Sequence, residues 1–188
     1  MFVFISGAVR SGKSSYAEAR AIESISKQSG GQLYYVATST VADHEMASRI
    51  KHHQQQREQA GVPWNVIEAQ VDIGSLAANF DERDIVLIDC LTTLLNNELF
   101  RTLDAKEYSL AKEKERTVAK LSQELDLFLH GNWTTLLVSN EVGDDIPYED
   151  EYTLAYQHAL SLLHQKLVRE GDEAVLVEHG IPLVKKGG

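Results

Sequence analysis

Two glycines, a lysine and a serine near the start of the chain have the types and spacing that most directly indicate chemistry. Gly7 is followed, after four residues, by Gly12, Lys13 and Ser14. Glycine at both positions permits a tight turn in which backbone N–H groups face an anion, because no Cβ obstructs the approach. Lys13 supplies a positive charge for terminal phosphates, and the Ser14 hydroxyl suits Mg²⁺. The pattern predicts a phosphate-binding loop for a nucleoside triphosphate.

The segments on either side have the patterns that such a loop needs. The apolar run 2–6 is typical of a buried strand, and residues 14–27 show a helical pattern. The order strand, loop, helix brings a helix N-terminus to the bound anion, where the helix dipole favours negative charge. The alternative, a glycine-rich turn that binds nothing, does not account for this order.

A second polar group lies in the segment 43–60, which also shows a helical pattern. Arg49, His53 and Arg57 are each four residues apart, so one helix face carries an imidazole between two guanidinium groups. Neighbouring cations lower the pKa of an imidazole and keep one ring nitrogen able to attack, while arginines suit phosphate oxygens. The pattern indicates a candidate nucleophile.

The same helix also permits a plainer interpretation, an exposed polar face beside Gln54, Gln55 and Gln56. His52 is rotated about 100° from its neighbour around the helix axis, so we expect an orienting or structural role for it. Metal binding by the pair is not expected, because no set of Cys and His ligands at suitable spacing accompanies it.

Polar side chains also stand at the ends of apolar runs. Asp89 ends one such run, where an acidic residue handles Mg²⁺ in folds with a phosphate loop; the alternative is a helix cap that includes Thr92 or Thr93. Glu68 is either a nucleotide contact or the outward residue of an edge strand. The segment 140–143 is predicted to be a loop at the rim of the site, or simply a turn.

The apolar runs alternate with helical patterns, which predicts an α/β fold with a mostly parallel sheet covered on both faces. Ligands of such sheets bind at the carboxyl ends of the strands, where Gly7, Thr38, Asp89 and Asn140 fall. Residues 179–186 indicate a tight turn and a closing antiparallel edge strand. The predicted strands are 2–6, 33–37, 64–69, 84–91, 134–139 and 173–178.

The region 103–130 is predicted to be one long amphipathic helix. We expect water, rather than a ligand, to face its charged residues, which are Lys106, Glu107, Lys112, Glu113, Lys114, Glu115 and Arg116.

Size, charge and cysteine content limit the number of domains, the partners and the cellular location that we expect for this protein. The 188 residues, with 43% apolar content, are predicted to form a single nucleotide-binding domain over 1–188. The net charge of −10 argues against nucleic acid as a partner, because such binding depends on Lys and Arg. Cys90 is the single cysteine and lies in an apolar run, which indicates burial in a reducing compartment. No apolar run reaches the length of a membrane span, so we expect a cytoplasmic protein.

Several stretches, taken in order, resemble one known family over nearly the whole chain. They are GAVRSGKS, YVATS, the helical segment with the histidine pair, DCLTT, SNEVG and DEAVLVEHGI. The histidine pair beside a phosphate loop is the most specific of these. The chain resembles the bifunctional adenosylcobinamide kinase / adenosylcobinamide-phosphate guanylyltransferases.

The resemblance implies two reactions on a corrinoid substrate. ATP or GTP phosphorylates the aminopropanol hydroxyl of adenosylcobinamide, and GMP is then transferred from GTP through a guanylyl-histidine, with release of pyrophosphate. The second histidine of the pair carries GMP in that family; it corresponds to His53 and favours the nucleophile over the polar face. The resemblance also implies Mg²⁺, a three-layer, RecA-like P-loop NTPase fold and a homotrimer.

Site residues are implied in the same way. His53 and Lys13 would act in catalysis, and Ser14 and Asp89 would hold Mg²⁺. The implied nucleotide contacts are Gly7, Ala8, Val9, Arg10, Ser11, Gly12, Lys13, Ser14, Ala37, Thr38, Ser39, Gln54, Gln55, Gln56, Arg57, Glu68 and Asp89.

The C-terminal third departs from the family pattern, and Asp89 stands where the family usually has Glu. If Gln157, His158 and Ser161 line the corrinoid site, adenosylcobinamide binds less tightly than the pattern implies, because charged partners are lost. The departures are Asp145-Ile146-Pro147 for Gly-Ile-Val-Pro, Tyr156-Gln157-His158 for Phe-Arg-Asp, and Ser161, His164 and Gln165 within Gly-x-x-Asn-Gln.

Three other functions stay open at this point. One is a relative that keeps a single activity or takes another acceptor. The second is a small-molecule kinase without a covalent intermediate. The third is a non-enzymatic GTP-binding switch, which needs a loop that responds to the γ-phosphate.

Overall fold

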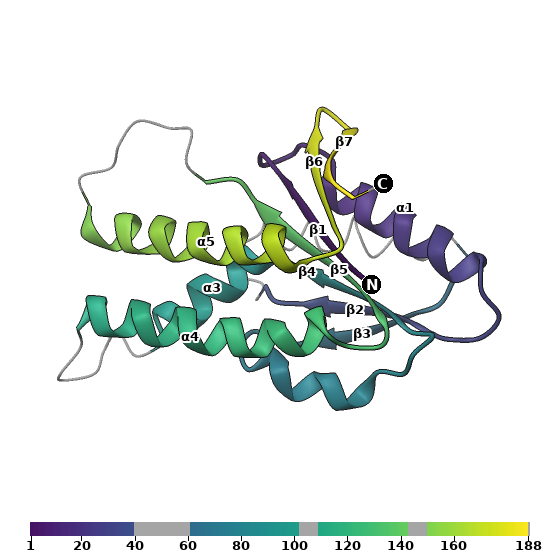
Figure 1. Ribbon diagram of the computed structural model, residues 1–188, viewed down its shortest axis with the longest axis horizontal. Helices are drawn as coiled ribbons and strands as arrows, with labels where there is room; N and C mark the ends of the chain where they lie inside the picture. Colours follow the sequence, from purple (N-terminus) through teal and green to yellow (C-terminus); the bar gives the residue numbers. More distant parts are fainter. Residues whose placement is uncertain (40–60, 102–108, 143–149, 188) are drawn as a thin grey trace.

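A mixed sheet flanked by helices forms the protein in the computed structural model, which describes residues 1–39, 61–101, 109–142 and 150–187 (Figure 1). The strands lie in the order β3-β2-β4-β5-β1-β6-β7, and every neighbouring pair is parallel except β6 and β7. The predicted mostly parallel sheet is confirmed. The strands are β1 (Phe2–Gly7), β2 (Leu33–Ala37), β3 (Trp64–Glu68), β4 (Ile85–Asp89), β5 (Thr134–Asn140), β6 (Glu173–Glu178) and β7 (Ile181–Lys186).

Helices cover both faces of this sheet, which gives three layers in the described part of the chain (Figure 1). The first face carries α1 (Lys13–Ser26). The other face carries α3 (Leu91–Leu99), α4 (Leu110–Leu129) and α5 (Glu151–Glu170). A 3-10 helix, η1 (Ile73–Asn79), packs against α4.

The apolar runs of the central strands follow from burial on both faces. In β4, Ile85 and Leu87 point into the core shared with α1, whereas Val86 and Ile88 point into the core shared with α3, α4 and α5. All four side chains are at most 2% exposed. A strand covered in this way has no position for a polar side chain, so its sequence shows no alternation.

Polar residues gather where the parallel strands end. Gly7 of β1 pairs with Asn140 of β5, and Ala37 of β2 pairs with both Glu68 of β3 and Asp89 of β4. Because these strands are parallel, their carboxyl ends lie together at the same end of the sheet. The expectation that the candidate residues meet at this end is confirmed.

The closing strand is also confirmed, since β7 pairs antiparallel with β6 at the edge of the sheet. The strand predicted over 84–91 is too long, because β4 ends at Asp89 and the apolar run continues into α3. Cys90 is the N-cap residue of that helix, which has no side-chain capping bond. The structure therefore gives no capping role to Asp89, Thr92 or Thr93.

The long helix predicted over 103–130 is seen as α4, and residues 102–108 lie outside the described part. Lys112, Glu115 and Arg116 are exposed, as expected of a hydrated face. Among the described helices, none combines the length and the apolar character that crossing a bilayer requires.

A lysine surrounded by carboxylates joins η1, α3 and α4. Lys120 Nζ lies 2.8 Å from Asp72 Oδ1 and 3.1 Å from Glu124 Oε1, and it also pairs with Glu98, whose side chain is 3% exposed. Burial alone lowers the pKa of Lys120, but the hydrogen bonds that its ammonium donates to these three carboxylates outweigh it and raise the pKa. The ammonium occupies the position that a cation would take among three acids.

Removing this charge should destabilise the fold. Replacing Lys120 with Met keeps most of the aliphatic stem but leaves Glu98 buried without its cation, so we expect a loss of roughly 3 kcal/mol in urea unfolding at pH 7. Lys112→Met, on the exposed face of the same helix, is the control and should change stability by about 0.5 kcal/mol at most. Equal stability of the two variants would contradict the prediction.

Candidate nucleotide site

The glycine-rich segment forms a closed loop between β1 and α1. Ser11 N–H donates to the Ala8 carbonyl at 3.1 Å, and Lys13 Nζ donates to the same carbonyl at 3.0 Å. Arg10 and Gly12 have positive φ, 63° and 90°, so the backbone turns sharply before the helix. Lys13 is only 7% exposed and is the first residue of α1. The predicted strand, loop and helix are confirmed in this order.

The turn between β6 and β7 packs directly on this loop. Gly180 N–H donates to the Ser11 carbonyl at 2.8 Å. A Cβ at Gly12 would lie 3.2 Å from Gly180 Cα, and a Cβ at Gly7 would lie 2.4 Å from the Val177 carbonyl oxygen. From the sequence, these two glycines were expected to leave room for phosphate. The structure shows that they also leave room for the backbone of the neighbouring hairpin.

The end of β4 is tied to the end of β2 by hydrogen bonds. Tyr35 OH donates to Asp89 Oδ2 at 3.0 Å, and Thr38 N–H donates to the Asp89 carbonyl at 3.1 Å. The buried Thr38 hydroxyl accepts from Cys90 N–H at 2.7 Å and donates to the Cys90 carbonyl at 2.8 Å. These bonds fix the carboxylate of Asp89 at the sheet edge, where the sequence placed it.

Burial raises the pKa of the Cys90 thiol, so this side chain stays protonated at neutral pH. Glu68 is exposed at the end of the edge strand β3. Four strand spacings, roughly 19 Å, separate β3 from β1, so only an extended ligand contacts both Glu68 and the phosphate loop. Its contact with nucleotide stays a prediction.

Several predicted site residues fall within 40–60 and lie outside the described residues: Arg49, His52, His53, Gln54, Gln55, Gln56 and Arg57. Their roles stay predictions that rest on the sequence.

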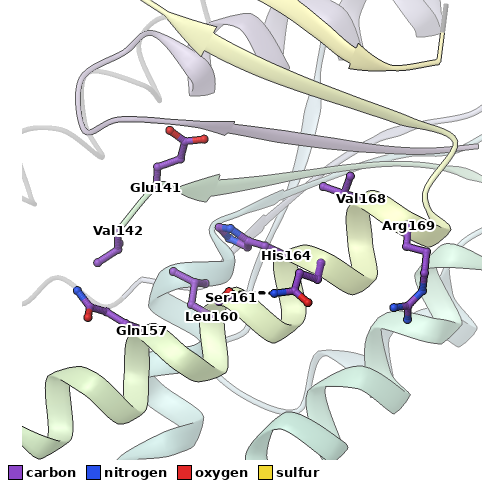
Figure 2. Close-up of a pocket in the computed structure, with 9 residues that line it drawn as sticks. Glu141, Val142, Gln157, Leu160, Ser161, His164, Val168 and Arg169 are labelled. Atoms are coloured by element: carbon purple, nitrogen blue, oxygen red, sulfur yellow. Dashed lines mark hydrogen bonds between the residues drawn. The ribbon is translucent and has the colours of Figure 1, made fainter. Parts of the chain in front are cut away.

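A pocket of about 600 Å³ lies beside α5, on the face of the sheet opposite α1 (Figure 2). Gln157 and Ser161 line it, as expected if they belong to the acceptor site. His158 does not line it, because this residue points to α4, where its Nδ1 lies 3.1 Å from Lys114 Nζ. The full lining is Glu141, Val142, Gln157, Leu160, Ser161, His164, Gln165, Val168 and Arg169.

His164 forms the inner wall of this pocket. Its Nε2 lies 2.7 Å from Ser139 Oγ, and its ring centroid lies 5.0 Å from that of Phe4. Burial lowers the pKa of His164 to about 4, so the imidazole is neutral at physiological pH. In the sequence, His164 stands out only as a departure from the family pattern. Its partners Ser139 and Phe4 lie on strands distant in the chain, so its role could not be read from its neighbours.

Known proteins are similar to this chain over nearly its whole length. The family model described as cobinamide kinase / cobinamide phosphate guanyltransferase matches residues 3–185. A protein of Escherichia coli (strain K12), named bifunctional adenosylcobalamin biosynthesis protein CobU, is 30% identical over 185 residues, which is 96% of this chain and 97% of that protein. The protein of the same name from Salmonella typhimurium (strain LT2) is 29% identical with the same coverage.

Solved structures resemble the fold at low sequence identity. A type III secretion system ATPase of pathogenic bacteria gives a TM-score of 0.59 at 10% identity, and the alignment covers 98% of this chain but 56% of the other. The flagellar accessory protein FlaH from Methanocaldococcus jannaschii gives 0.52 at 13% identity, covering 100% of this chain and 78% of the other. These likenesses show the fold, which is that of RecA-like P-loop NTPases.

The close approach at Gly12 yields a testable prediction. Gly12→Ala adds a Cβ to a residue with φ of 90° and brings it against Gly180, so the loop must shift. We expect nucleotide affinity, measured by titration with a fluorescent GTP analogue, to fall at least tenfold. Gly61→Ala is the control, because Gly61 also has positive φ, 71°, but nothing lies within 4 Å of its added Cβ. Similar affinities in the two variants would show that the contact does not shape the loop.

His164 yields a prediction about pH. Its folded pKa of about 4 lies below the unfolded value of about 6.5, so the unfolded chain binds an extra proton between these pH values. The free energy of unfolding should therefore fall as the pH drops from 6.5 to 4, with up to about 3 kcal/mol from this group. His164→Asn should flatten that slope in urea unfolding, whereas His158→Asn, exposed on the same helix, should not. A slope unchanged in His164→Asn would refute the assignment.

Proposed function

The chain belongs to the cobinamide kinase / cobinamide phosphate guanyltransferase family, and from this premise we propose a course for its two reactions on adenosylcobinamide. The kinase reaction transfers the γ-phosphoryl group of ATP or GTP to the corrinoid hydroxyl. The guanylyltransferase reaction then joins GMP from GTP to the corrinoid phosphate. The observation that carries the proposal is the formed phosphate loop at the carboxyl end of β1, which lies between β5 and β6 in the sheet.

The loop and the helix that follows it would hold the triphosphate. Backbone N–H groups at the N-terminus of α1 and the ammonium of Lys13 suit the phosphate oxygens. The Ser14 hydroxyl and the Asp89 carboxylate are oxygen ligands of the kind that Mg²⁺ prefers, and they stand at neighbouring ends of α1 and β4. Bound Mg²⁺ would neutralise charge on the phosphates. Asp89 is kept in place for this by the hydrogen bond from Tyr35.

We propose that His53 is the nucleophile of the guanylyl transfer. A ring nitrogen of His53 attacks the α-phosphorus of GTP, the N–P bond forms, and the bond to the leaving pyrophosphate breaks. A phosphate oxygen of the phosphorylated corrinoid then attacks the same phosphorus, and His53 leaves. Support comes from the sequence, in which Arg49 and Arg57 flank His53 at helical spacing.

We further propose that the protein acts as a homotrimer, as the resemblance implies. The edge strand β7 supports an interface, because Ile181 and Val184 leave 62% and 53% of their surfaces exposed. Light scattering coupled to size exclusion measures the oligomer directly.

Label from GTP separates the proposed mechanism from its alternatives. α-Labelled GTP should label the protein with release of pyrophosphate, γ-labelled GTP should not, and acid should remove the label, because a phosphoramidate is acid-labile. His53→Ala should abolish labelling but keep nucleotide binding, whereas Lys13→Ala should weaken both, by roughly tenfold or more. His52→Ala is the matched control and should still be labelled.

The opposite results have distinct meanings. A simple kinase would transfer the γ-phosphoryl group to the acceptor and never carry α-label. A GTP-binding switch would give neither label nor pyrophosphate. Labelling that persists in His53→Ala would refute the role of this histidine even with both activities present.

A further inference from the structure

One residue of the pocket beside α5 is hydrogen-bonded to the first residue of the phosphate loop. Glu141 follows the last residue of β5 and lines the pocket. Its N–H donates to the carbonyl of Gly7, the first glycine of the loop, at 3.0 Å, and its Oε1 accepts from Ser6 Oγ at 3.2 Å. Figure 2 shows Glu141 at one end of the pocket, on the side of the strands. A ligand that reaches Glu141 therefore comes close to the start of the phosphate loop.

The pocket runs along α5 and has apolar side chains in its lining. It extends along α5 from Gln157 to Arg169, which is roughly 18 Å at 1.5 Å per residue. Val142 and Val168 line it and leave 40% and 39% of their surfaces exposed. Open apolar side chains of this kind provide a surface for a macrocycle, and the volume of about 600 Å³ is in the range of small-molecule sites.

The polar groups of the pocket are mostly uncharged. Gln157, Ser161 and Gln165 present amide and hydroxyl groups, and Gln165 Nε2 donates to Ser161 Oγ at 3.3 Å. His164 is a neutral imidazole held by Ser139. Such groups both donate and accept hydrogen bonds, so they match the carboxamide side chains of a cobinamide rather than a charged ligand. Arg169, at the far end, is already paired with Glu170.

We propose that this pocket binds the corrinoid acceptor and that the Glu141 carboxylate, at its end nearest the loop, takes the proton from the acceptor hydroxyl. The inference rests on the kinase activity proposed above and assigns its acceptor site and base. The hydroxyl oxygen attacks the γ-phosphorus of the bound triphosphate and forms an O–P bond. The bond from that phosphorus to the β–γ bridging oxygen breaks, the nucleoside diphosphate leaves, and the hydroxyl proton passes to Glu141.

A bulky side chain in the pocket tests the acceptor site. Ser161 is exposed within the pocket, so Ser161→Trp fills the space without disturbing the core. We expect the Kd for adenosylcobinamide, measured by calorimetry, and its KM in the kinase assay to rise at least tenfold, with GTP affinity and α-labelling unchanged. Leu162→Trp, 40% exposed on α5 outside the pocket lining, is the control and should leave all four values unchanged.

Glu141→Gln tests the base. The kcat for phosphoryl transfer to adenosylcobinamide should fall about 100-fold or more with little change in either KM, because general base catalysis contributes about that much. Glu141→Asp should recover part of the rate, because it keeps a carboxylate at this position. Self-labelling from α-labelled GTP should persist, since that step removes no proton from the acceptor. Glu151→Gln is the control, because Glu151 is exposed at the start of α5; this variant should keep the wild-type kcat.

Each negative result would overturn a different part of the proposal. Wild-type affinity for adenosylcobinamide in Ser161→Trp would overturn the acceptor site, whether or not the protein turns the corrinoid over. An unchanged kcat in Glu141→Gln would overturn the base alone. Absence of phosphoryl transfer in the wild type, beside corrinoid binding that Ser161→Trp abolishes, would overturn the proposed kinase function and leave the binding pocket in place.

Discussion

The backbone contact between the phosphate loop and the β6–β7 turn is the constraint on which the site depends. The Gly180 N–H bonds the Ser11 carbonyl, and Gly7 at the start of the loop lies close to the Val177 carbonyl of β6, so the same hairpin contacts the loop at two points. Both contacts need residues without side chains, because a Cβ would occupy the space of the backbone. The loop is thus shaped by neighbouring strands before any phosphate binds.

Strand β1 also divides the site into two halves. Its carboxyl end continues into the loop and α1 on one face of the sheet, while its neighbour β5 continues into Glu141 and the pocket on the other. The register that pairs Gly7 with Asn140 brings these halves together at a single strand end. A donor held by the loop and an acceptor held by α5 would therefore meet without either crossing the sheet.

The sequence allowed good prediction of strands and of the loop, because burial on both faces leaves continuous apolar runs and the loop needs glycine at fixed spacing. It failed where two elements share one apolar run, as at Cys90, where β4 has ended and α3 begins. Only Gln157 and Ser161 of the pocket were anticipated from the sequence, since the packing of α5 on the sheet is what brings Glu141 and His164 into one lining. The role of Lys120 depends likewise on carboxylates from three separate elements.

The position of β1 within the sheet has a consequence for biosynthesis on the ribosome. This strand precedes the other described strands in the sequence, yet it lies between β5 and β6, and its loop is closed by Gly180. A nascent chain therefore carries the complete glycine motif long before the strands that shape it have been translated. A loop shaped in this way would therefore bind nucleotide only after the residues up to Gly180 have been translated.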